Sequence, residues 1–141
     1  MVRPVSPPSI QTDRAASSRR SRPTSSRLPR LLLVDDDPSV LRGMSRLLFE
    51  QWNVTTAHSA SQAALLLDAF RYRTVITDFE MPGHDGIWLL ERVRQRYPEV
   101  RRLLISGNEP DEFTEYLRSG LIECFLRKPV SRASLAVSLE E

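Results

Sequence analysis

The sequence is poor in lysine and cysteine, and it has no long apolar run. Of its 20 lysine and arginine residues, only Lys128 is a lysine. The single cysteine, Cys124, cannot form an internal disulfide, which fits a reducing compartment, so we expect a cytoplasmic protein. No segment approaches the roughly 20 consecutive apolar residues that a transmembrane helix needs, so no membrane span is predicted.

Charge divides the chain into two unequal parts. Residues 1–30 contain seven arginines and one acid, a net charge of +6, whereas residues 31–141 have a net charge of −4. The first 29 residues are rich in serine and proline and contain too few apolar side chains to offset the entropy lost on ordering. We therefore expect a disordered basic tail over residues 1–29 and one folded domain over residues 30–141.

Several interpretations of this tail remain open. It can be a solvated extension, or an electrostatic tether for nucleic acid, anionic lipid or an acidic partner. The absence of interleaved aromatic residues argues against the tether, and nucleic acid is not expected as a partner except through this basic segment. Its composition also resembles a transit peptide or a twin-arginine signal, but no apolar region follows the pair Arg19 and Arg20 within the tail. A start codon assigned too far upstream explains the tail equally well.

The remainder of the chain alternates short β-rich runs with helical periods. Strands are predicted over residues 30–34, 53–57, 74–77, 101–105 and 123–127, and one helix follows each strand: a first beginning at residue 38, then 61–70, 86–97, 111–119 and 131–140. This order predicts an α/β fold with a doubly wound, five-stranded parallel sheet of the flavodoxin-like (βα)5 type and helices on both faces.

The start of the first predicted helix accounts for one of three consecutive aspartates. Pro38 is tolerated at the first helical position, and Asp37 before it can cap the free N–H groups. Asp35 and Asp36 therefore remain available for chemistry. A further acid, Asp78, ends the third predicted strand, and Lys128 ends the fifth. Because the carboxyl ends of parallel strands meet at one edge of the sheet, these side chains should converge, and the ammonium indicates a phosphate site.

These segments resemble the receiver domain of bacterial two-component response regulators. The resemblance covers residues 30–141 and rests on four motifs in the expected order: Val34-Asp35-Asp36; Asp78 with Met81-Pro82-Gly83 and Asp85-Gly86; Ile105-Ser106-Gly107; and Phe125-Leu126-Arg127-Lys128-Pro129. It implies that Asp78 accepts a phosphoryl group from a sensor histidine kinase or a histidine phosphotransfer protein.

The resemblance also implies a magnesium ion, which would offset the repulsion between the carboxylates and the phosphoryl group. In the family pattern, Asp36 and Asp78 ligate the ion directly, Asp35 acts through water, and Glu80 contributes its backbone carbonyl. An all-oxygen site of this kind suits magnesium.

The remaining family roles fall on three residues. Lys128 would contact a phosphoryl oxygen, and Ser106 would donate its hydroxyl to another. Phe125 would be a movable switch residue beside a partner-binding face formed by the fourth helix and fifth strand. The resemblance further implies a cis peptide bond between Lys128 and Pro129.

Simpler structural explanations exist for each of these residues. Asp35 and Asp36 can be acids at a helix start, Lys128 a surface charge, Ser106 a turn residue and Phe125 a core residue. For the other notable side chains, the structural explanation is the expected one: His58 and His84 in loops, Cys124 as a small buried residue, and Trp52 and Trp88 packed beside helices.

Three functions are compatible with the sequence. The first is a stand-alone phosphorylation switch, because no linker or effector follows Glu141 in this sequence. The second is the receiver part of a longer regulator with a DNA-binding or enzymatic output domain. The third is an aspartyl-phosphate phosphohydrolase, but such enzymes place a second aspartate two residues after the nucleophile on the first strand, whereas Glu80 fills that spacing after the third. We expect no enzymatic activity beyond the chain's own phosphorylation and dephosphorylation.

Overall fold

The computed structural model describes residues 27–140, so almost all of the predicted tail lies outside the described residues. The strands are β1 (Arg30–Val34), β2 (Asn53–Ala57), β3 (Thr74–Asp78), β4 (Arg101–Ser106) and β5 (Cys124–Arg127). The helices are α2 (Pro38–Leu48), α3 (Ala60–Ala69), α4 (Gly86–Arg96), α5 (Thr114–Arg118) and α6 (Arg132–Ser138), with a short 3₁₀ helix, η2 (Pro110–Phe113). No helix among these residues is long and apolar enough to cross a membrane.

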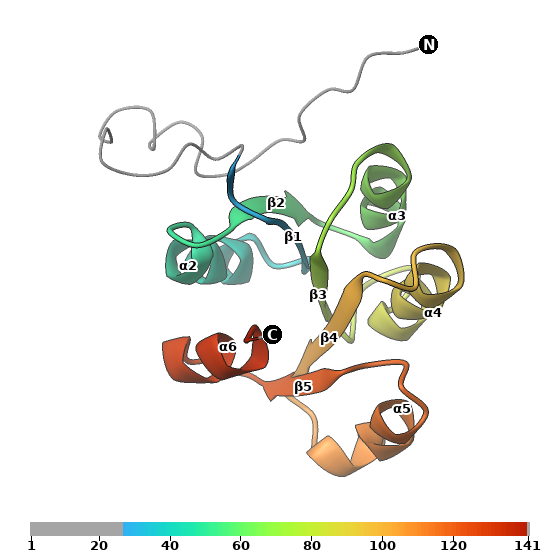
Figure 1. Cartoon of the computed structure of the whole chain (residues 1–141). Helices are drawn as coiled ribbons and strands as arrows, with labels where there is room; N and C mark the ends of the chain where they lie inside the picture. The colour runs from blue at the N-terminus through green and yellow to red at the C-terminus, as the bar shows by residue number, and fades with distance from the viewer. Residues whose placement is uncertain (1–26, 141) are drawn as a thin grey trace.

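The five strands form one parallel sheet in the order β2-β1-β3-β4-β5. This arrangement confirms the predicted doubly wound fold (Figure 1). The chain reverses its direction of winding between β1 and β3, which are neighbours in the sheet. Open parallel sheets of this type place their sites in the crevice at such a point, beyond the carboxyl ends of the strands.

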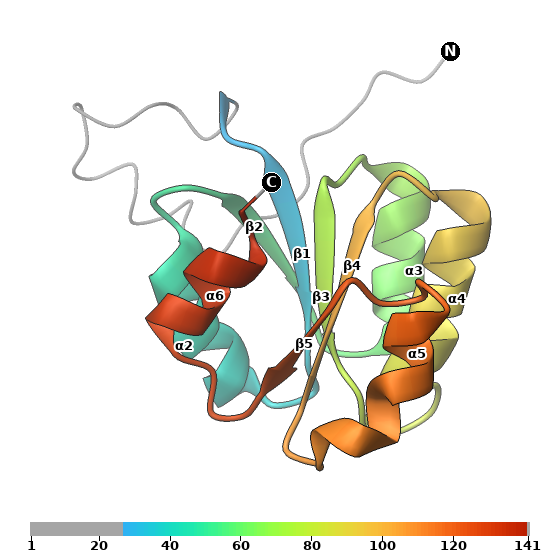
Figure 2. The same ribbon diagram turned by 60° about the horizontal axis from the view of Figure 1, so that its bottom comes forward.

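Two apolar layers separate the sheet from its helices. Helices α2 and α6 cover one face, and α3, α4 and α5 cover the other (Figure 2). The central strands contribute to both layers, since alternate side chains of a strand point to opposite faces. Leu32 and Val75 belong to the layer under α3 and α4, whereas Leu33 and Ile76 belong to the layer under α2 and α6. Burial on both faces explains the continuous apolar runs of β1 (residues 31–34) and β4 (residues 103–105).

Side-chain caps fix the starts of four helices, and the sequence predicted the cap at Asp37. The carboxylate of Asp37 accepts the N–H of Ser39 at the start of α2, and that of Asp85 accepts the N–H of Trp88 at the start of α4. Ser59 and Ser131 cap α3 and α6 in the same way. Each cap satisfies N–H groups that the helix itself leaves unpaired.

The predicted fourth helix is wrong in detail. Instead of one helix over residues 111–119, the structure has η2 followed by α5, and the break falls at Phe113, whose backbone angles (φ −112°, ψ 8°) are not those of an α-helix. Phe113 is only 1% exposed, so its ring is anchored in the core at this break. Leu117, an apolar residue of α5, is 41% exposed.

Two smaller expectations also need correction. Cys124 is only partly buried, because it begins β5, an edge strand of the sheet. Its Sγ donates a hydrogen bond of 3.2 Å to Ser138 Oγ. The fifth helix ends at Ser138 rather than at residue 140. The expectation that Trp52 packs beside its helix is confirmed, since it is buried in the layer under α2.

A buried arginine that sequence reasoning missed joins two loops of the fold. The guanidinium of Arg102 donates to the carbonyls of Leu121 (2.8 Å), Val100 (2.9 Å), Pro98 (3.2 Å) and Gly120 (3.2 Å). Burial lowers the pKa of this arginine. The four carbonyl oxygens satisfy its buried N–H groups by accepting their hydrogen bonds. Arg102 thus ties the connection before β4 to the connection before β5.

Candidate functional site

Three carboxylates meet at the carboxyl ends of β1 and β3. Asp35 and Asp36 follow β1 directly, and Asp78 is the last residue of β3. Their oxygens lie within 4.8 Å of one another. Asp35 and Asp78 are 2% and 6% exposed, whereas Asp36 is exposed. Three acids held this closely repel one another and fit a divalent cation with oxygen ligands.

Lys128 supplies the positive charge at this cluster. Its Nζ lies 3.0 Å from Asp35 Oδ2 and 3.0 Å from Asp78 Oδ1. The backbone N–H of Lys128 donates to the carbonyl of Ser106 at 2.9 Å, which holds the end of β5 against the end of β4. The predicted cis peptide bond between Lys128 and Pro129 is confirmed.

Burial and ion pairing shift the acid–base behaviour of Asp78 and Lys128. Burial raises the pKa of Asp78; the hydrogen bond from Lys128 opposes this shift and the charge of Asp35 adds to it, so the pKa remains above its usual range. Burial lowers the pKa of Lys128, but its hydrogen bonds to Asp78 and Asp35 outweigh that effect and raise the pKa. Lys128 is therefore a cation at neutral pH.

Asp35 has partners for both of its oxygens. Its Oδ1 accepts the N–H of Asp37 at 2.9 Å, and its Oδ2 pairs with Lys128. Asp36 is placed differently, since its side chain is exposed at the same edge of the sheet. The two adjacent acids therefore have different environments: one is fixed within the protein and the other faces solvent.

The other candidate residues lie around this centre. Ser106, 3% exposed, ends β4, and its Oγ accepts the N–H of Asn108 at 3.0 Å. Glu80 is exposed on the loop two residues after Asp78. Phe125 is half-buried in β5 and stacks on Phe113 rather than joining the acidic cluster.

The two histidines stay outside the carboxylate cluster. His58 follows β2 and is exposed, and its backbone N–H donates to the side chain of Gln62 at 2.6 Å. His84 is also exposed, and its ring stacks on Trp88 with centroids 3.8 Å apart and planes 7° apart. These positions agree with the structural explanation given for both residues.

Thr77, which sequence reasoning missed, and the motif residue Gly86 position the end of β3. The hydroxyl of Thr77 donates to the carbonyl of Asp78 at 3.0 Å. At Gly86, the first residue of α4, an added Cβ would lie 2.3 Å from that same carbonyl oxygen. The start of α4 can therefore approach the backbone of Asp78 only because residue 86 has no side chain. A glycine directly after the helix cap Asp85 was the signal in the sequence.

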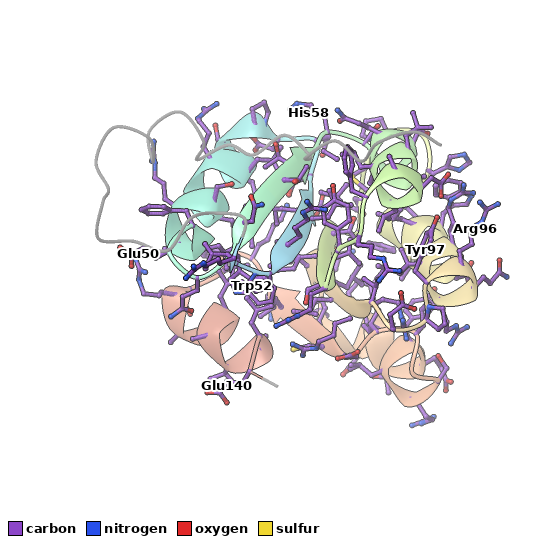
Figure 3. The ribbon with its side chains drawn as sticks, turned by 45° about the horizontal axis from the view of Figure 1, so that its top comes forward. Glu50, Trp52, His58, Arg96, Tyr97 and Glu140 are labelled. Carbon is purple, nitrogen blue, oxygen red and sulfur yellow. The ribbon has the colours of Figure 1, made fainter. Side chains whose placement is uncertain are left out.

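A hollow of about 650 Å³ lies at the opposite edge of the sheet. It is lined by the ends of α2 and α6 and by residues that precede β1 and β2, including Pro29 and Trp52. Figure 3 shows Glu50 and Trp52 beside the end of α2, and Glu140 just beyond α6. Because Asp78 lies at the carboxyl ends of the strands, this hollow is separate from the acidic cluster.

Comparison with known proteins agrees with this geometry. Residues 31–140 match the response regulator receiver domain. The chain belongs to this family.

Several curated relatives are similar to this domain. The chain is 37% identical over 82 residues to the hydrogenase transcriptional regulatory protein HoxA of Cupriavidus necator, covering 58% of this chain and 17% of that protein. It is 31% identical over 114 residues to the transcriptional regulatory protein GlrR of Escherichia coli, covering 79% of this chain and 25% of that protein. A 31% identity over 116 residues to the sensor kinase CckA of Brucella abortus covers 79% of this chain and 12% of that protein. The chain thus spans a quarter or less of these relatives.

Solved structures agree with the fold. The signal receiver domain of an HD domain-containing protein from Pseudomonas fluorescens has a TM-score of 0.74 and 31% identity, covering 80% of this chain and 92% of that one. The chemotaxis response regulator CheY4 of Vibrio cholerae has a TM-score of 0.73 and 23% identity, covering 79% of this chain and 96% of that one. At that identity the second likeness concerns the fold alone.

Proposed function

We propose that this chain is a phosphorylation-dependent signalling switch in which Asp78 accepts a phosphoryl group from a phosphohistidine. The observation that carries the proposal is the convergence of three carboxylates and one ammonium at a single edge of the sheet. The donor would be a sensor histidine kinase or a histidine phosphotransfer protein, and the reaction would take place in the cytoplasm.

The transfer needs a nucleophile that approaches phosphorus from a fixed direction. Asp78 is nearly buried, and its backbone carbonyl is held by Thr77. One of its carboxylate oxygens would form the new O–P bond as the N–P bond of the phosphohistidine breaks, and the imidazole nitrogen would keep the electron pair of the broken bond. The product is an acyl phosphate. The nucleophile must be ionised, and the ammonium of Lys128, 3.0 Å from Asp78 Oδ1, favours the ionised carboxylate.

Magnesium fits the carboxylate cluster. When bound, it supplies positive charge that offsets the repulsion between the carboxylates and the incoming phosphoryl group. Asp36 and Asp78 would ligate it directly, and the carbonyl of Glu80 would be a further ligand. Asp35 would act through water, because its two oxygens already bind Lys128 and the N–H of Asp37. The different burial of Asp35 and Asp36 supports this division.

Lys128 and Ser106 would each contact an oxygen of the bound phosphoryl group. In the structure, Lys128 bridges Asp35 and Asp78, so its ammonium is already positioned beside the nucleophile. It would exchange part of this contact for a phosphoryl oxygen. Ser106 lies on the neighbouring strand end and its carbonyl accepts the N–H of Lys128. Its hydroxyl would donate to a second phosphoryl oxygen, and the change would reach Phe125 and the face formed by α5 and β5, where an output protein would bind.

A longer regulator is the second candidate. It is favoured by the coverage of the relatives, since this chain spans 17% of HoxA and 25% of GlrR. In that case the face formed by α5 and β5 would act on an attached output domain rather than on a separate protein. The phosphoacceptor chemistry would be the same in both arrangements.

A small phosphodonor tests the proposal. The protein is incubated with acetyl phosphate and magnesium, and bound phosphate is measured by intact mass. We expect one acid-labile phosphate on the wild type and none on Asp78→Asn, because an amide keeps the shape of the carboxylate but is not a nucleophile. Asp111→Asn, at an exposed acid of η2, is the matched control and should label normally. Equal labelling of Asp78→Asn and wild type would contradict the assignment.

A further inference from the structure

A chain of aromatic contacts begins at the residue that follows Asp78. The ring of Phe79 meets the ring of Phe113 edge to face, with centroids 5.0 Å apart and planes at 75°. Phe113 in turn stacks on Phe125, with centroids 4.9 Å apart and planes at 25°. The three rings come from the end of β3, from η2 and from β5. They link the immediate neighbour of Asp78 with the candidate switch residue.

Phe113 is the central member of this chain. It is only 1% exposed, whereas Phe79 and Phe125 are half-buried. It is also the residue at which η2 ends and α5 begins, and its ring lies 6.4 Å from that of Tyr116 on α5. A movement of the Phe113 ring would therefore change the junction between the two helices.

The two ends of the aromatic chain are held differently. The N–H of Phe79 donates to the carbonyl of Ile105 at 2.9 Å, and the carbonyl of Phe79 accepts the N–H of Gly86 at 2.9 Å. These bonds fix Phe79 between β4 and α4. Phe125 has one ring face against Phe113 and is partly exposed. Because the interior is close-packed, the ring of Phe125 can move deeper into the core only if the ring of Phe113 also moves.

We propose that Phe113 couples the state of Asp78 to Phe125 and α5 through these ring contacts, by a route separate from the hydroxyl of Ser106. This inference rests on the proposed function. Phe113 is a positioning residue: its stack on Phe125 stabilises the half-buried position of that ring, and its edge contact with Phe79 connects the stack to the segment that carries the nucleophile.

The contact energy sets the size of the expected effect. An aromatic pair contributes enough beyond simple burial to change an equilibrium by about twofold to tenfold. Coupling between two sites is reciprocal, so a substitution that releases Phe125 must also change the affinity of a phosphoryl mimic at Asp78 by a corresponding factor. Phe113→Leu keeps an apolar side chain and removes the ring. It should tighten the binding of beryllofluoride with magnesium by about twofold to tenfold.

The same variant should reduce the change in amide resonances that beryllofluoride causes on the face formed by α5 and β5. In the wild type, beryllofluoride should shift the amide resonances of residues 111–127. In Phe113→Leu, the resonances of β5 should already be displaced before the mimic is added, and the further change in α5 should be reduced. Phe79→Leu, which removes only the edge contact, should reduce the change in α5 while leaving the starting resonances of Phe125 in place.

Leu67→Ala is the matched control for a loss of core packing. Leu67 is 4% exposed in the same apolar layer, but it lies on α3, which α4 separates from α5 (Figure 1). It should lower stability without changing the affinity for beryllofluoride or the response of residues 111–127. A purely structural role for Phe113 would give the same result as this control.

Titration of the four proteins with beryllofluoride and magnesium, followed by amide resonances, tests the inference. The inference is supported if Phe113→Leu binds beryllofluoride more tightly and the amide resonances of α5 then change less than in the wild type. Wild-type affinity with the full wild-type response in Phe113→Leu and Phe79→Leu overturns it, while phosphorylation of Asp78 stands. If the wild type itself neither binds beryllofluoride nor accepts phosphate, the proposed function fails and this inference fails with it. Should Phe113→Leu not fold, Phe79→Leu alone decides, since a full response there breaks the proposed route.

Discussion

The ammonium of Lys128 lies 3.0 Å from the carboxylate of Asp78 and, at the same distance, from that of Asp35. One side chain from the end of β5 therefore neutralises part of the charge on acids from two other strand ends. The Lys128 side chain is 30% exposed, whereas those of Asp35 and Asp78 are 3% and 9% exposed, so the ion pairs face solvent on the lysine side only. This arrangement makes Lys128 a structural support for the site as well as its candidate phosphate contact.

Removing this ammonium should destabilise the protein. Lys128→Met leaves two buried carboxylates without their cation, and we expect the free energy of unfolding to fall by about 1–3 kcal/mol. Arg127→Met is the control, because Arg127 pairs with Glu109 on the surface, where both side chains are more than half exposed, and such pairs contribute little. Urea denaturation measures both. Equal stability of Lys128→Met and wild type would show that the buried pairs do not support the fold.

The raised pKa of Asp78 makes a prediction about pH. The folded state disfavours the ionised carboxyl, so ionised Asp78 costs folding free energy; the cost begins above the ordinary aspartate pKa of about 3.9 and is complete above the folded-state pKa. Asp78→Asn should therefore raise the melting temperature at neutral pH, while Lys128 keeps Asp35 as a partner. The gain should disappear at pH values below the ordinary aspartate pKa. A variant less stable than wild type at neutral pH would contradict this reading of the site.

Asp35 and Asp36 should respond differently to substitution. Asp36→Ala removes the proposed direct magnesium ligand, an exposed carboxylate, so magnesium affinity should fall strongly, while the free energy of unfolding without magnesium should change by less than about 0.5 kcal/mol. Asp35→Ala removes the partner of Lys128 and of the Asp37 N–H, so it should reduce stability more and magnesium affinity less. Magnesium titration and urea denaturation separate the two effects. Equal magnesium affinities of the two variants would refute the assigned roles.

Gly86 offers a test of how closely the site is positioned. Gly86→Ala places a Cβ 2.3 Å from the carbonyl oxygen of Asp78, so the end of β3 or the start of α4 must move. We expect a loss of about 1–3 kcal/mol in stability and slower phosphorylation by acetyl phosphate. Gly43→Ala, in the exposed middle of α2 with no heavy atom within 4 Å of the added Cβ, should instead gain up to about 1 kcal/mol and phosphorylate normally. Normal phosphorylation of Gly86→Ala would show that the site tolerates this displacement.

Much of the fold could be predicted because local and global signals agree. The β-rich runs 30–34 and 74–77 lie where the structure has β1 and β3, and Asp37 caps α2 as expected. These elements are long and strongly patterned, so tertiary packing did not override them.

The fourth helix could not be predicted in detail, because its pattern conflicts with the packing of one residue. Phe113 fits a helical period in the sequence, but its ring is drawn into a cluster with Phe79 and Phe125, and the backbone leaves the helical conformation there. The periodicity of a single sequence carries no information about contacts between the residue after β3, η2 and β5. For the same reason, the four hydrogen bonds from Arg102 to backbone carbonyls could not be predicted, because they join loops that are distant in the sequence.

The candidate site was predictable for a different reason. Chemistry-bearing residues that each follow a strand of a parallel sheet must share one edge, and the structure brings Asp35, Asp36, Asp78 and Lys128 together there. Their partners were not predictable: the bond from the Asp37 N–H to Asp35 and the close approach of Gly86 to Asp78 depend on atomic positions.

Direct mapping of the acyl phosphate tests the central claim. The protein is phosphorylated with acetyl phosphate and magnesium and treated with borohydride, which reduces an acyl phosphate to an alcohol and so converts the labelled aspartate to homoserine. Peptide mass spectrometry then locates the change. We predict conversion at Asp78 alone, dependent on both acetyl phosphate and magnesium. Conversion at Asp35, Asp36 or another residue, with Asp78 unmodified, would contradict the account.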